Sequence, residues 1–196
     1  MKAFAFVIAA VVALTLSACF PPYTTHPLGT TIGLSNDPLL AGTWRADPPS
    51  GDTSGKFQYY HFLPAKNGTI LAVAVPSVGE SSDLLLVRLT TARVGAVGIM
   101  NARLMPGPDS DASGQAPGTI PVLYRQDAQG RLLLFTPNED AVRDAIKAGT
   151  IGGTVGKDGA GDAVVTSDGP ALDKYFLSKT GLALFTDLQL TLTKVN

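Results

Sequence analysis

Few residues in this chain have the types and spacing that chemistry requires. The sequence holds one cysteine, Cys19, and two histidines, His26 and His61. A serine or cysteine nucleophile needs a nearby base such as histidine, and a zinc site needs several Cys or His ligands. Only His61 lies in the part expected to fold, and no motif provides it with such partners. We therefore predict no catalytic residue, no metal site and no cofactor, and a protein that is not an enzyme.

Two stretches begin like binding loops but do not complete the motif. Residues 109–114 start as an EF-hand calcium loop does, yet its twelfth position, which should be a bidentate Glu, is Ile120. Gly156-Lys157-Asp158 lacks both the upstream Gly and the following Ser or Thr of a phosphate-binding loop. We predict a polar surface loop in the first case and a turn between strands 150–155 and 163–166 in the second.

The cysteine has a setting that concerns location. Lys2 precedes an apolar run from Ala3 to Leu16, which is too short to span a bilayer comfortably and is typical of a secretory signal peptide. Leu16-Ser17-Ala18-Cys19 resembles the lipobox of bacterial lipoproteins. The resemblance implies that residues 1–18 are removed, that the Cys19 sulfur carries diacylglycerol, and that the new amino terminus is acylated, for example with palmitate.

Such an anchor would tether the protein to a membrane. Each buried methylene contributes about 0.8 kcal/mol, so two or three acyl chains hold a protein firmly. In Gram-negative lipoproteins an Asp after the cysteine retains the product at the inner membrane; Phe20 stands there, and by that resemblance the outer membrane is favoured. The alternative, an uncleaved anchor from Ala3 to Phe20, has only one basic residue and a marginal length.

Composition then sets the domain organisation. Residues 19–36 are rich in Pro, Thr and Gly, which predicts a flexible tether of roughly 20–25 Å containing a solvated His26. Residues 37–196 are enough for one β-rich domain. The net charge of −1 offers no clustered basic surface for nucleic acid. If Cys19 is lipidated, no cysteine remains for a disulfide.

From residue 37 onward the chain is patterned mainly as β-strands. Asn67-Gly68 between apolar runs at 56–65 and 69–76 is the strongest short hairpin signal. Further strands are expected at 82–91, 95–104, 120–126 and 131–135. Two short helices are predicted to cover strands that are apolar on both faces. The first follows a cap at Thr136 with a capping box to Glu139 and ends at Gly149; the second spans 170–179 and ends at Gly181.

Gly42-Thr43-Trp44, after a short turn at Asp37 to Leu40, resembles the opening of lipocalins and the wider calycin group of barrels. In that group the Trp lies across the closed end of the barrel beneath a basic side chain of the last strand. The resemblance implies a contact between Trp44 and Lys194, which follows Leu188, Leu190 and Leu192 along one strand face. The predicted fold is an antiparallel calycin-like β-barrel, or a sandwich with Trp44 in its core, with two short packing helices.

These features favour a membrane-anchored, non-enzymatic envelope lipoprotein. An eight-stranded barrel can hold one small ligand, so we predict a small apolar ligand, with Tyr59, His61 and Arg88 as polar lining residues. The alternative is a protein-interaction or envelope-assembly accessory whose barrel is filled by its own side chains. Residues 60–69 and 139–142 also resemble an uncharacterised family of bacterial lipoproteins, which implies no activity.

Overall fold

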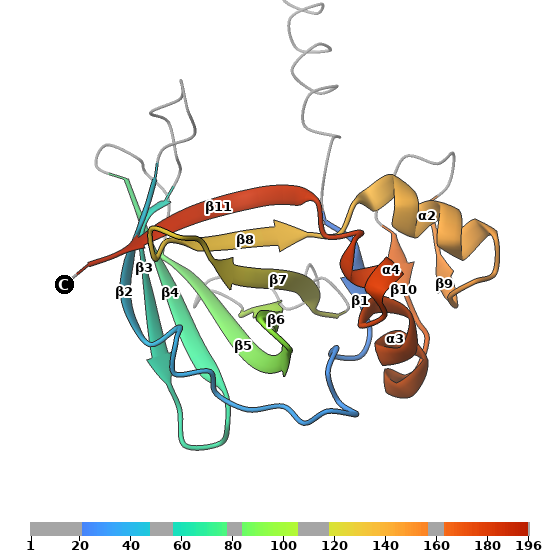
Figure 1. The fold of residues 1–196 in the computed structure, drawn as a ribbon, viewed down its shortest axis with the longest axis horizontal. Coiled ribbons are helices and arrows are strands. Elements are labelled where there is room, and N and C mark those ends of the chain that lie inside the picture. Colours follow the sequence, from blue (N-terminus) through green and yellow to red (C-terminus); the bar gives the residue numbers. More distant parts are fainter. Residues whose placement is uncertain (1–20, 48–56, 78–83, 106–117, 157–162, 196) are drawn as a thin grey trace, which may run out of the picture.

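The computed structural model describes residues 21–47, 57–77, 84–105, 118–156 and 163–195. Eight antiparallel strands close into one barrel in the order β11-β2-β3-β4-β5-β6-β7-β8 (Figure 1). Their bounds are β2 Gly42–Ala46, β3 Phe57–Pro64, β4 Ile70–Pro76, β5 Leu85–Val94, β6 Val97–Leu104, β7 Ile120–Gln126, β8 Leu132–Thr136 and β11 Asp187–Lys194. The chain is therefore a closed β-barrel and not a sandwich.

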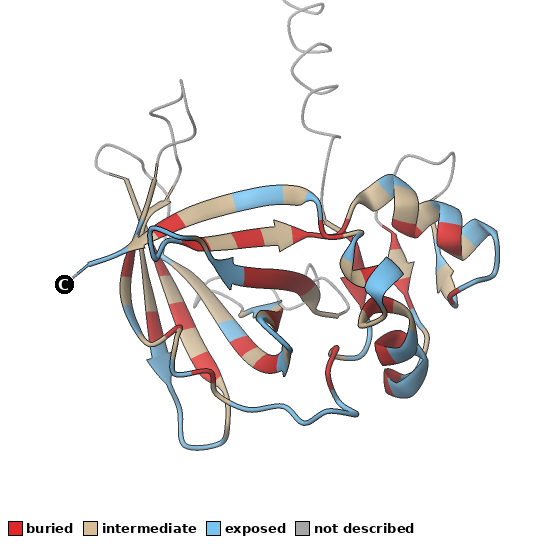
Figure 2. Ribbon diagram, in the orientation of Figure 1, coloured by how far each residue is buried: buried red, intermediate tan, exposed pale blue. Residues whose placement is uncertain are grey.

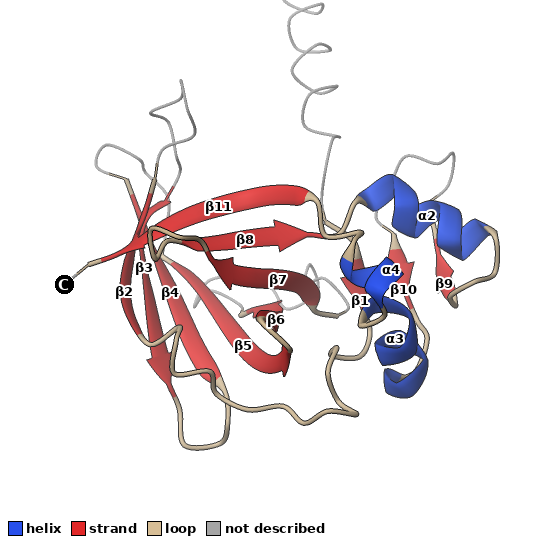
Figure 3. Cartoon of the chain, in the orientation of Figure 1, coloured by secondary structure: helices blue, strands red, loops and turns tan. Residues whose placement is uncertain are grey.

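A smaller sheet and three helices lie beside the barrel. The sheet pairs β1 Tyr23–Thr24 in parallel with β10 Val164–Val165, which pairs antiparallel with β9 Gly153–Thr154. The helices are α2 Glu139–Lys147, α3 Gly169–Phe176 and α4 Lys179–Leu182. All of them lie between β8 and β11 in the chain (Figure 3). They share a second apolar cluster with Ile99 and Leu123, whose side chains point outward from the barrel.

The strands follow the predicted pattern with one shifted turn. The Asn67-Gly68 hairpin is present: Ala65 N–H donates to Thr69 O over 2.8 Å, and Gly68 has a φ of 76°. β5 was expected to end at residue 91, but the ladder continues to the pair of Val94 with Val97. The predicted pairing of strands around 153 and 165 is also confirmed.

The first helix begins two residues later than its sequence suggests. Thr136 is the last residue of β8 and is buried, so it cannot cap the helix. Asn138 is the cap, and its Oδ1 accepts a 3.0 Å hydrogen bond from Ala141 N–H. Glu139 forms an ion pair with Arg143 one turn later instead of closing a capping box. The helix does end before Gly149, whose φ is 67°.

The second predicted helix is two helices. α3 begins after its cap Asp168 and ends at Phe176; α4 begins after its own cap, Ser178. Gly181 lies inside α4 and does not terminate a helix. A Cβ there would lie 2.0 Å from the carbonyl oxygen of Tyr175, so this glycine permits the close approach of α4 to the end of α3.

Residues 21–36, expected to belong to a tether, lie against the barrel; we call them the strap. Thr24 N–H donates to Thr119 O over 2.8 Å, and Thr119 N–H donates back to Thr24 O over 2.9 Å. Leu28 is fully buried, and the side-chain amide of Asn101 bonds both its N–H (2.7 Å) and its carbonyl (2.9 Å). Backbone groups of this Pro-, Thr- and Gly-rich segment therefore form hydrogen bonds with residues far along the chain. The predicted signal peptide (residues 1–18), Cys19, Phe20 and residues 109–114 and 157–162 lie outside the described residues.

Candidate ligand-binding site in the barrel

The alternating strand directions give the barrel two different ends. At the closed end, short turns join β3 to β4, β5 to β6 and β7 to β8. At the other end β2, β4, β6 and β8 finish and β3, β5, β7 and β11 begin; we call this the open end. The candidate site is the interior between them.

Trp44 lies across the closed end of the barrel. Its side chain is fully buried, and its Nε1–H donates a 2.9 Å hydrogen bond to the carbonyl of Leu40, which is also fully buried. Lys194 Nζ lies 5.4 Å from the centroid of the Trp44 ring, which confirms the predicted contact between the first and last strands of the barrel. Tryptophan, turn and lysine together form the floor of the barrel.

A polar group fastens the same turn to the barrel wall. Asp37 is buried, and its Oδ2 accepts 2.7 Å hydrogen bonds from Arg93 Nη1 and from Tyr124 Oη. Burial alone would raise the pKa of Asp37, but the hydrogen bonds from Arg93 and Tyr124 outweigh it, and the pKa lies below its ordinary value. The carboxylate is therefore charged and serves a structural role at the closed end.

The inward-facing residues differ in burial from one end of the barrel to the other. Figure 2 colours each described residue by its burial. Large, almost fully buried side chains fill the half next to the floor: Trp44, Phe62, Ile70, Leu89, Met100, Tyr124, Leu132 and Leu192. Half-buried side chains of the same cluster gather toward the open end: Ala46, Tyr60, Val87, Ala102, Ile120 and Leu190. Inward side chains are thus almost fully buried at the floor, whereas those toward the opening range from buried, as Ala74 is, to half-buried.

Several small side chains point inward in the half of the barrel next to the open end, which we call the upper half. Ala46, Ala72, Ala74 and Ala102 take inward positions on β2, β4 and β6, where alternation along each strand continues the face of Trp44, Ile70 and Met100. Alanine is the smallest side chain at these inward positions, and Ala72 and Ala74 are buried, with 5% and 2% of their surface exposed. A closed barrel of eight strands with small inward side chains is compatible with binding a small ligand.

Tyr60 provides a polar group in this half. It pairs across the sheet with Trp44 on one side and Ala74 on the other. Burial raises the pKa of Tyr60 to about 12, so its hydroxyl is neutral at physiological pH. Within the described part of the chain this hydroxyl has no hydrogen-bond partner, so it is available to a ligand. The sequence analysis predicted that its neighbours on β3, Tyr59 and His61, line the interior. The pairing of Tyr60 with Trp44 shows that Tyr60 points inward instead.

The three lining residues suggested by the sequence lie elsewhere. Tyr59 and His61 alternate with the inward Tyr60 and Phe62, so their side chains lie on the outer face of β3. His61 Nδ1 is 2.9 Å from Thr43 Oγ1 on the neighbouring strand.

Arg88 is likewise outside the interior. It is exposed and stands between the inward Val87 and Leu89. None of the three side chains reaches the interior, because alternation along a strand sends each to the face opposite its neighbours.

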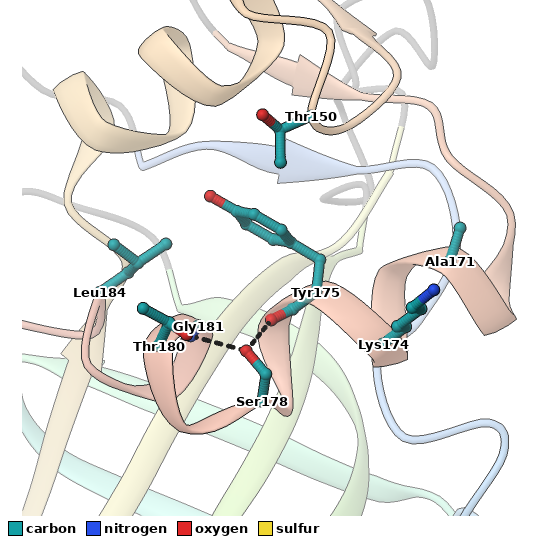
Figure 4. Close-up of a pocket in the computed structure, with 8 residues that line it drawn as sticks. All are labelled: Thr150, Ala171, Lys174, Tyr175, Ser178, Thr180, Gly181 and Leu184. Atoms are coloured by element: carbon teal, nitrogen blue, oxygen red, sulfur yellow. Dashed lines mark hydrogen bonds between the residues drawn. The ribbon is translucent and has the colours of Figure 1, made fainter.

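A second hollow lies among the helices, away from the barrel interior (Figure 4). It has a volume of about 580 Å³ and is lined by Thr150, Ala171, Lys174, Tyr175, Ser178, Thr180, Gly181 and Leu184. Ser178 Oγ donates to the carbonyl of Tyr175 (2.7 Å) and accepts from Gly181 N–H (3.0 Å), so it serves as a helix cap. Both hydrogen bonds of this hydroxyl are thus made within the α3–α4 junction.

The described residues contain no cluster of three or more His, Cys, Asp or Glu side chains that could hold a metal ion. No helix among them is long and apolar enough to cross a membrane. Comparison of the chain with protein-family models, with curated proteins and with solved structures finds no match.

Proposed function

We propose that this protein is a bacterial envelope lipoprotein, anchored through acylated Cys19, whose barrel binds a small apolar molecule. The anchor rests on the Leu16-Ser17-Ala18-Cys19 motif. The binding function rests on the interior, in which Trp44 and large neighbours close one end, while four alanines stand among Tyr60, Val87, Ile120 and Leu190 toward the other. A barrel filled throughout by its own side chains would carry large residues at those four positions as well.

The chemistry of the interior indicates the class of ligand. Its walls are apolar, so each Å² of apolar ligand surface removed from water contributes roughly 25 cal/mol. Polar contacts are few, and the Tyr60 hydroxyl supplies one hydrogen bond. A single hydrocarbon chain or a slender hydrophobe bearing one polar group suits such a site better than a sugar or a nucleotide does.

The sole tryptophan provides a direct test. Trp44 lies on the floor of the barrel, so a fatty acid that carries bromine on its chain should quench the Trp44 emission when it enters. The protein used should begin at Pro21, because the strap is part of the folded structure. Saturable quenching supports the proposal; unchanged emission at all fatty-acid concentrations contradicts it.

A filling variant makes the test specific for the interior. Ala102→Phe adds a ring at an inward position of the upper half and should abolish quenching. Ala128→Phe adds the same ring in the exposed turn between β7 and β8 and should leave quenching unchanged. Equal quenching in both variants would place the fatty acid outside the barrel.

One observation favours the alternative, a protein-interaction accessory. The outer faces of β3, β4 and β5 carry apolar side chains: Leu63, Leu71, Val73, Val75 and Leu86. Leu63 is 50% exposed, and the helices lie on the other side of the barrel (Figure 1). Crosslinking of the anchored protein in its membrane from a photoreactive group at residue 73 tests this alternative, since a partner on that face should be captured there and not from a group at residue 129.

A further inference from the structure

The strap has a direction that links the membrane anchor to one end of the barrel. Its first strand, β1, lies beside the start of β7 (Figure 1), and the paired hydrogen bonds of Thr24 and Thr119 join them immediately before Ile120. Ile120 is one of the half-buried interior residues at the open end. The strap therefore begins at the open end.

The remaining contacts follow in order toward the floor. Leu28 bonds to Asn101 in the middle of β6, and Ser35 N–H donates to Thr91 O over 2.8 Å. Asn36 Nδ2 then reaches the carbonyl of Ala65 in the closed-end turn, and Asp37 joins the floor. Residues 21–37 thus run once along the barrel from its open end to its closed end.

The length of chain before the strap limits where a lipid on Cys19 can be. Thr24 lies five positions after Cys19, and five extended residues span at most about 18 Å. A diacylglycerol on Cys19 therefore enters the bilayer close to the open end. Had residues 21–36 been a flexible tether, the lipid would have imposed no such orientation.

Apolar side chains are exposed at the same end. Leu104, the last residue of β6, is 39% exposed, and Leu188, near the start of β11, is 52% exposed. Leu63 and Val195 are exposed toward the closed end, so exposed leucines alone do not distinguish the ends. The course of the strap does.

We infer that the open end of the barrel faces the membrane surface and that the ligand is an acyl chain taken directly from that membrane. This inference rests on the proposed function, both on the Cys19 anchor and on binding in the upper half of the barrel. In this orientation an acyl chain can pass between bilayer and barrel interior with little exposure to water, and Tyr60 can donate a hydrogen bond to its polar end.

The test places a fluorophore at each end of the lipidated full-length protein in vesicles of phosphatidylethanolamine and phosphatidylglycerol. Because Cys19 would be blocked by lipid, Leu104→Cys and Gln129→Cys each introduce one free thiol for a polarity-sensitive label. Phospholipids with brominated chains should remove most of the emission of the Leu104→Cys label and leave that of the Gln129→Cys label unchanged. Leu188→Cys is the second open-end position if the Leu104 variant does not fold.

Trp44 separates the two proposals in the same samples. Quenching of Trp44 by brominated phospholipid, together with the end-specific label result, supports membrane loading. If free bromo-fatty acid quenches Trp44 but the open-end labels stay in water, the orientation is wrong and the binding function stands. If the open-end labels are quenched but Trp44 is not, acyl-chain binding itself is overturned. If the protein does not associate with vesicles, the proposed anchor is wrong, and the inference is overturned with it.

Discussion

The Oη atom of Tyr124 donates a 2.7 Å hydrogen bond to Oδ2 of Asp37, although 87 positions separate the two residues. The bond joins the wall of the barrel to the turn that leads into its floor. A hydrogen bond to a charged, buried group contributes about 1.5–3 kcal/mol. Tyr124→Phe should therefore lower the free energy of unfolding by an amount in this range, measured by urea denaturation at pH 7. An unchanged midpoint would show that the turn is held without this bond.

Because Asp37 is charged in the folded protein, the free energy of unfolding should depend on pH in the acid range. Its pKa is lower in the folded protein than the ordinary value of 3.8, so its stabilising contribution is present in full above that value. The contribution is lost as the pH falls through the lowered pKa. Asp37→Asn should be less stable than the native protein at pH 7, and the gap should narrow below about pH 4. Denaturation curves between pH 2 and 7 check this; a constant gap would contradict it.

Gly98 should tolerate no side chain while Tyr124 is present. A Cβ at position 98 would lie 2.0 Å from Cζ of the Tyr124 ring on the adjacent strand. We expect Gly98→Ala to cost about 1–3 kcal/mol through overpacking. In a Tyr124→Leu background the same change should cost much less, and the coupling between the two sites is measured by a double-mutant cycle. Equal costs in both backgrounds would mean that the ring moves aside freely.

The strap should detach when its clamp on α3 is removed. Asp173 is buried; its Oδ1 accepts a 2.6 Å bond from Gly29 N–H, and its Oδ2 accepts a 2.8 Å bond from Thr31 N–H. Asp173→Asn replaces one acceptor with a donor that opposes these N–H groups. Hydrogen exchange at residues 28–31 should accelerate at least tenfold, equivalent to about 1.4 kcal/mol. Asp140→Asn, on the exposed side of α2, is the control and should leave exchange unchanged.

Membrane attachment should require the Cys19 sulfur. Cys19→Ala should abolish incorporation of labelled palmitate and move the protein from the membrane fraction to the soluble fraction. Ser17→Ala keeps the cysteine and a small residue before Ala18, so it should retain both properties. Membrane attachment of the alanine variant at position 19 would favour the uncleaved anchor.

Local patterns in the sequence predicted the barrel well because its hairpins are local. Asn67-Gly68 specifies a turn between neighbouring strands, and alternation specifies which residues share a face. The contact of Lys194 with Trp44 is distant in sequence but followed from strand periodicity together with the lipocalin resemblance. Leu188 shows the limit of periodicity. A register shift between Leu188 and Leu190 places Leu188 on the outer face, so it does not share the inward face of Leu190 and Leu192.

The strap and the inward-facing side of β3 were not predictable in the same way. The strap depends on Asn101 and Asp173, which lie 73 and 144 positions from their partners Leu28 and Gly29. The local sequence of this Pro- and Thr-rich segment does not indicate which distant residues form hydrogen bonds with it. On β3 the alternation was clear, but whether Tyr59 or Tyr60 points inward depends on the pairing of Tyr60 with Trp44.

The strap also sets an order of events during folding. Residues 21–36 leave the ribosome first, whereas their clamp Asp173 and their partner strand β10 are made near the end of the chain. Contacts of such long sequence separation form late, because the intervening chain must be ordered before they gain anything. Before those contacts form, residues 21–36 are not held against the barrel, and in the proposed lipoprotein Cys19 would then be accessible to the enzymes that acylate it. Once α3 folds, residues 21–36 are fixed along the barrel, and in the proposed lipoprotein this step would bring the barrel close to the acylated Cys19.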